Sequence, residues 1–161
     1  MKAALLAAVV VLGAALLVVP ALGLGSGDGR KVLEARVLAP LAPPYLGPAG
    51  TIRNVPGAGA QWSIGDAEVD LRSDGRLEID VEGLIVTPLG RNPLPQFKAI
   101  VSCQTTINGT AAVANVSSPL VAASPTGDAE IDTTIALPSP CIAPIVFVTS
   151  PGGAWFAATG R

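Results

Sequence analysis

The chain has 161 residues, half of them hydrophobic, and its formal net charge at pH 7 is only −2. This length is typical of one ordinary domain, and the weak charge argues against a nucleic-acid partner, which would need a basic patch. The chain contains no histidine, so catalytic arrangements that pair histidine with serine or cysteine are excluded.

The N-terminal residues 1–23 have the pattern of a secretory signal peptide. Lys2 precedes an uninterrupted apolar run, Ala3–Val19, and the segment ends with the small residues Ala21 and Gly23. This pattern predicts export and cleavage after Gly23. The alternative is a retained membrane anchor, because about 20 apolar residues are enough to span a bilayer. We therefore expect a secreted or cell-envelope protein that contacts the membrane only if this segment is retained.

The rest of the chain is expected to form a flexible glycine-rich linker, residues 24–30, and a single domain, residues 31–161. Residues 31–38 fit either a short helix or an opening strand. Prolines make residues 40–48 a rigid, extended connector. A short strand is expected at Thr51–Val55, ended by a proline and two glycines.

The clearest element is a β-hairpin formed by Ala67–Leu71 and Leu77–Val81. Apolar residues alternate with polar residues in both segments, most of them acidic, and Ser73-Asp74-Gly75 supplies a three-residue turn. The alternation fixes the register that pairs Val69 with Ile79, because a shift of one residue would place acidic side chains among the apolar ones.

Further short segments with alternating or apolar patterns follow along the chain. Strands are expected at residues 97–103, 111–116, 128–137, 145–149 and 154–159, and the last two flank a turn at 150–153. The chain then has about eight short strands separated by frequent turns. This organisation predicts an all-β fold, an antiparallel β-sandwich.

Cys103 and Cys141 are the only two cysteines. An even cysteine count in an exported chain indicates a disulfide. The alternatives are two buried thiols or a pair of metal ligands, although two cysteines without histidine do not make a usual zinc site.

Acidic residues dominate the polar face of the predicted hairpin. In its register Asp70 faces Glu78 and Glu68 faces Asp80, and like charges directly opposite each other destabilise a sheet. A divalent cation, above all calcium, would relieve the repulsion through oxygen ligands, so these four residues are candidate metal ligands. The alternative is a solvated polar face whose carboxylates are interleaved with basic side chains, from the set Arg53, Arg72, Arg76 and Lys98.

Trp155 and Phe156 are candidate contact residues. Neighbouring residues of a strand point to opposite faces of the sheet. One of the two rings is therefore expected to pack inward, while the other is expected to be exposed and available to a ligand.

One internal segment resembles a known family of secreted modules. Residues 66–84 (DAEVDLRSDGRLEIDVEGL) are similar to chordin-type (CHRD) repeats, in which strands alternate around an xDGxL turn and end in GL. Those repeats continue with a histidine-containing segment, which this chain lacks. Residues 140–160 are similar to uncharacterised secreted proteins of bacteria. Both resemblances imply a secreted β-rich protein, and neither carries a functional residue to this chain.

These observations together predict an exported structural or binding module of the cell envelope or the extracellular space, without enzymatic activity. Its expected partner is an extracellular protein or a glycan. The first alternative is a calcium-dependent binding domain that uses the acidic hairpin face, with calcium as the only cofactor considered. A hydrolase of unknown substrate is the second alternative.

Overall fold

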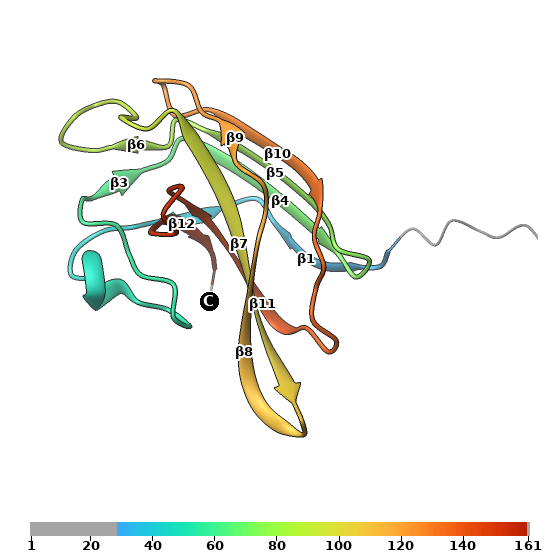
Figure 1. Ribbon diagram of the computed structural model, residues 1–161. Helices are drawn as coiled ribbons and strands as arrows, with labels where there is room; N and C mark the ends of the chain where they lie inside the picture. Colours follow the sequence, from blue (N-terminus) through green and yellow to red (C-terminus); the bar gives the residue numbers. More distant parts are fainter. Residues whose placement is uncertain (1–28, 161) are drawn as a thin grey trace, which may run out of the picture.

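The computed structural model describes residues 29–160 (Figure 1). The predicted signal peptide or anchor and most of the predicted linker lie outside the described residues. In the described part of the chain, no helix is long and apolar enough to cross a bilayer. The fold is all-β, as predicted, and consists of antiparallel sheets packed together as a β-sandwich.

The first main sheet contains the predicted hairpin. Its strand order is β1-β4-β5-β10, and all neighbours are antiparallel. The strands are β1 (Lys31–Ala35), β4 (Asp66–Arg72), β5 (Arg76–Glu82) and β10 (Ala129–Thr134). Val69 lies opposite Ile79 in the hairpin β4–β5, so the predicted register is confirmed. The apolar residues of both strands are buried, while the polar ones between them are half-buried or exposed.

The second main sheet has the order β2-β12-β11-β7-β8, and a short strand, β9, also pairs with β7. Its strands are β2 (Leu38–Pro40), β7 (Gln96–Ile107), β8 (Thr110–Ser117), β9 (Val121–Ala122), β11 (Ile142–Thr149) and β12 (Trp155–Thr159). A separate small ladder joins β3 (Trp62–Ser63) to β6 (Ile85–Val86).

The described residues contain twelve strands where about eight were expected. The strands that the alternation missed are two or three residues long, too short to show a period. The ambiguous segment 31–38 belongs to two strands, because the chain leaves the first sheet after β1 and enters the second at β2.

The prediction of a strand at Thr51–Val55 is wrong. This segment is a tight turn in which the main chains of Ile52 and Val55 exchange two hydrogen bonds. Arg53 and Asn54 occupy the centre of the turn with φ values of 47° and 66°. A left-handed backbone at two successive residues reverses the chain and ends any strand there.

The part of the second sheet formed by β12, the central residues of β7 and the second half of β11 is buried, with neighbours packed on both faces of β12. On the inner face, Phe156 stacks on Trp62 with ring centroids 3.9 Å apart, and Phe97 lies against both rings. The outer face is covered by residues 41–60, which we call the covering segment; it includes a short 3₁₀ helix, η1 (Gly47–Gly50). Main-chain hydrogen bonds join this segment to β12, and every residue of β12 is buried.

Candidate functional site

Most acidic residues of the described chain gather on the outer face of the first sheet. Cα partners across this sheet form two acidic rows, Glu68–Asp80–Glu130 and Glu34–Asp70–Glu78–Asp132. A third pair is Asp66 with Glu82. We call these nine residues the acidic face. The predicted pairs Asp70–Glu78 and Glu68–Asp80 are therefore confirmed, and a shallow hollow of about 250 Å³ lies over them.

Basic side chains from β1 and from the ends of the hairpin neutralise part of this face. The Lys31 ammonium lies 2.6 Å from an Asp70 carboxylate oxygen and 3.2 Å from a Glu34 oxygen. These two hydrogen bonds raise the pKa of Lys31, with Asp70 making the larger contribution. The acidic face is therefore tied to the edge strand β1 by ion pairs, and exposed pairs of this kind are worth little each.

Two further carboxylates of the predicted metal set also have basic partners. Arg36 approaches Glu68 at 3.6 Å, and Arg76 lies 2.6 Å from Glu78. Of the basic residues that were expected to interleave, Arg72 and Arg76 do so. The other two do not belong to this sheet, since Lys98 is on β7 and Arg53 is in the covering segment.

The described residues contain no group of three or more acidic, histidine or cysteine side chains that could hold a metal ion. Asp80 is the one member of the predicted set without an ion pair in the described part of the chain, while Glu68 and Glu78 each have one and Asp70 has two. Calcium binding by the acidic face therefore stays an untested hypothesis, and the arrangement observed matches the alternative of a solvated, partly neutralised face.

Asp128 stands apart from the acidic rows, although the sequence pattern placed it in the same strand as Glu130. It precedes β10, and its carboxylate accepts hydrogen bonds from the Thr126 hydroxyl, the Gly83 N–H and the Ser124 hydroxyl. These bonds lower its pKa, with Thr126 contributing most. Asp128 thereby fixes the kink at Gly83 (φ 67°), where the chain leaves β5 for the small ladder.

The predicted disulfide between Cys103 and Cys141 is present, and it closes a loop with a sequence separation of 38. Cys103 lies on β7, and Cys141 lies immediately before β11. The bond fastens the connection between β10 and β11 to the hairpin of β7 and β8. It is also consistent with an oxidising compartment, where disulfides form and persist.

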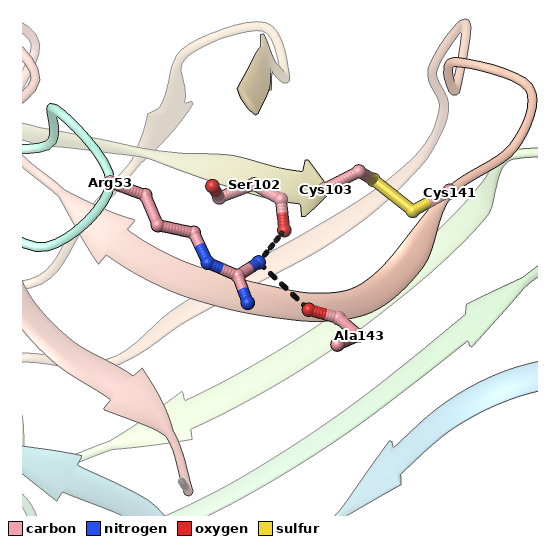
Figure 2. Close-up of a disulfide and its surroundings, with 5 residues drawn as sticks. All are labelled: Arg53, Ser102, Cys103, Cys141 and Ala143. Carbon is pink, nitrogen blue, oxygen red and sulfur yellow. Dashed lines mark hydrogen bonds between the residues drawn. A yellow bond between two sulfur atoms is a disulfide. The ribbon is translucent and has the colours of Figure 1, made fainter. Parts of the chain in front are cut away.

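Beside the disulfide, Arg53 connects the covering segment to the second sheet (Figure 2). One guanidinium nitrogen donates hydrogen bonds to the carbonyl oxygens of Ala143, at 2.8 Å, and Ser102, at 3.1 Å. The Arg53 carbonyl in turn accepts a hydrogen bond from the Asn115 side chain. Sequence reasoning considered Arg53 only as a partner for acids and missed this role, because the pattern did not show that residues 53 and 54 form a turn.

The expectation that Trp155 or Phe156 is exposed is wrong. The two residues are 6% and 2% exposed. Their rings have different neighbours, as expected for adjacent residues of a strand: Phe156 packs on Trp62, and Trp155 packs near Phe147 on the side of the covering segment. The Trp155 indole N–H donates to the Gly50 carbonyl at 2.7 Å. Covering-segment residues therefore occupy the position at which a ligand had been expected.

The covering segment leaves a groove open beside β2 and β12. The groove has a volume of about 750 Å³. Its walls include Pro40, Tyr45, Ile52, Ile145 and Trp155, and no charged residue lines it in the part of the chain that the structure describes. Sequence reasoning treated residues 40–48 as a connector only. An aromatic residue such as Tyr45 among four prolines was the signal that could have drawn attention to this segment.

Comparison of the chain with protein-family models, with curated proteins and with solved structures finds no match. The resemblance of residues 66–84 to chordin-type repeats therefore stays a prediction.

Proposed function

We propose that this protein is an exported, non-enzymatic binding module that holds an uncharged, apolar segment of another extracellular protein in the groove beside β2 and β12. The observation that carries the proposal is the groove itself. Its volume of about 750 Å³ lies within the range of ligand sites, which are concave and mostly apolar.

The chemistry of the walls favours a peptide over a sugar. The groove is bordered by proline, alanine, isoleucine and tyrosine side chains, and among the described residues that line it only Tyr45, Thr51 and Thr159 carry a side-chain hydroxyl. A glycan presents many hydroxyl groups, and each one left without a partner on burial costs free energy. The apolar side chains of a peptide do not incur this loss, because they carry no hydrogen-bonding groups.

Two further observations support export and a binding role. The N-terminal pattern of residues 1–23 is that of a signal peptide, and the disulfide suits an oxidising environment. The chain has no histidine, so a hydrolase that pairs histidine with serine or cysteine is excluded, and the sequence contains no recognised catalytic motif.

The proposal is tested by selecting short random peptides from a displayed library on the disulfide-bonded protein. We expect the selected peptides to be apolar and uncharged. Ala49 is exposed and lines the groove, so Ala49→Arg should extend a charged side chain over it and weaken peptide binding at least about tenfold, or about 1.4 kcal/mol. The matched control is Ala136→Arg, an exposed alanine outside the groove.

Two outcomes would contradict the proposal. One is that no apolar peptides are enriched; the other is that the enriched peptides bind the Ala49→Arg protein as well as they bind the unchanged protein. If a glycan array instead shows binding that Ala49→Arg abolishes and Ala136→Arg preserves, the groove is a sugar site and the peptide proposal is wrong.

A further inference from the structure

Apart from the two-residue strand β9, the main sheets end in four strands, and three of these carry features that protect an edge from pairing with another chain. β1 is short, carries Lys31 and Glu34, and has an irregular register with its neighbour. β10 carries Glu130 and Asp132. β2 has only three residues and ends at Pro40. Charged side chains, proline, irregular pairing and short length are the devices by which natural sheets avoid edge-to-edge association.

The fourth edge strand, β8, has none of these devices. Its eight residues, TAAVANVS, include no charge and no proline, and all of them pair with β7 in regular register. Figure 1 shows β8 at the margin of its sheet, in a hairpin that extends away from the body of the sandwich. No turn, loop or side-chain hydrogen bond in the described residues engages the β8 main chain on its open side.

The geometry of the β7–β8 hairpin identifies which main-chain N–H and C=O groups of β8 have no partner in the sheet. A two-residue turn, Asn108-Gly109, with φ values of 52° and 77°, joins β7 to β8 and makes Ile107 and Thr110 a directly opposed pair. In an antiparallel ladder, main-chain groups point alternately to one side and the other. The N–H and C=O groups of Ala111, Val113 and Asn115 therefore point away from β7.

We propose that β8 pairs with β8 of a second copy of this chain, antiparallel and about a two-fold axis, so that the two large sheets become one continuous sheet. In the register that pairs these outward-pointing main-chain groups, Val113 lies opposite Val113 of the second copy, and Ala111 lies opposite Asn115 of the second copy. Small and β-branched side chains meet across this pairing, and no like charges are brought together.

The arrangement of charge in the chain favours a second copy over another partner. The segment 83–127, which includes β7 and β8, contains no acidic residue. Two copies can therefore meet along β8 without bringing their acidic faces together. The other edges of the same protein are charged or too short to match an uncharged eight-residue strand. The pairing is consequently isologous and closes as a dimer rather than a fibre.

The test measures the mass of the oxidised, exported protein by sedimentation over a range of concentrations. We expect a concentration-dependent dimer. Val113→Lys places two ammonium groups on the axis and should abolish the dimer, while the matched control Val37→Lys, at a residue 75% exposed outside any strand, should preserve it. Ala111→Pro removes an N–H that points away from β7, so it should abolish the dimer and leave the hairpin paired.

Thermal melting of each variant establishes whether it is folded. The two β8 variants act by different physical means, one by charge repulsion and one by loss of an N–H group. If one of them fails to fold, the other still tests the proposal. The proposal is overturned if the unchanged protein stays monomeric over the accessible concentration range. It is also overturned if a dimer forms and persists in whichever β8 variants are folded.

Discussion

Removal of the disulfide should lower stability by an amount set mainly by the length of the loop it closes. In the chain-entropy model, a loop with a sequence separation of 38 restricts the unfolded chain by about 4 kcal/mol. For a domain of this size, the entropy of unfolding near the melting temperature is about 0.3 kcal/mol/K, so the loss corresponds to a fall of about 10–15 °C. The reduced protein should still fold, because Cys103 is one member of a large buried core.

Calorimetry of the oxidised and the reduced protein tests this value without changing the sequence. The double variant Cys103→Ala/Cys141→Ala serves as a second comparison, and it should melt close to the reduced protein, slightly lower because Cys103 is fully buried. A difference of less than about 3 °C between oxidised and reduced protein would refute the reasoning, since the bond would then restrict the unfolded chain far less than its loop length requires.

Three further predictions concern single features of the first sheet. Gly75→Ala should destabilise the protein by about 2–4 kcal/mol in chemical denaturation, because Gly75 has φ 91° and a Cβ there would overlap the Ile135 carbonyl; a loss below about 0.5 kcal/mol would contradict it. The folded-state pKa of Asp128 lies below its usual value of 3.8, so its stabilising contribution is present above that pH and disappears as the pH falls through the lowered value. Melting curves of the unchanged protein and of Asp128→Asn should therefore differ at neutral pH and converge below about pH 4, and a constant difference would disprove the linkage. Calcium, compared with EDTA, should leave the melting temperature unchanged, because basic side chains already neutralise part of the acidic face; a calcium-dependent rise of several degrees would restore the metal-site hypothesis.

The hairpin β4–β5 shows why part of this fold could be predicted from the sequence. Its alternation is strict, and any other register would bury carboxylates, so the pairing of Val69 with Ile79 follows from the residues alone. The disulfide follows equally directly, because only two cysteines exist. The Asn108-Gly109 turn was also predictable, since Asn-Gly between two apolar segments is a strong hairpin signal. The turns expected from the sequence nevertheless did not include it.

The covering segment shows what could not be predicted. This segment is attached to the second sheet by main-chain hydrogen bonds and by the hydrogen bonds that the Arg53 guanidinium donates to main-chain carbonyl oxygens. Such contacts leave no periodic trace in a sequence, because every residue offers the same main-chain groups. The alternation correctly indicated that Trp155 and Phe156 point to opposite faces. It did not indicate that residues far away in the chain cover the outer face, and the exposed ring was therefore predicted wrongly.

The two proposals can be separated because they use different parts of the second sheet. The groove lies beside β2 and β12, at one edge of that sheet, while β8 is the opposite edge. Ala49→Arg should therefore abolish peptide binding and leave the dimer intact, and Val113→Lys should have the reverse effect. If each variant disturbed both properties, the groove and the β8 edge would be coupled through the sheet between them. A module that both pairs with its own copies and binds another protein needs two independent contact surfaces, and the two proposals together place both on this one small domain.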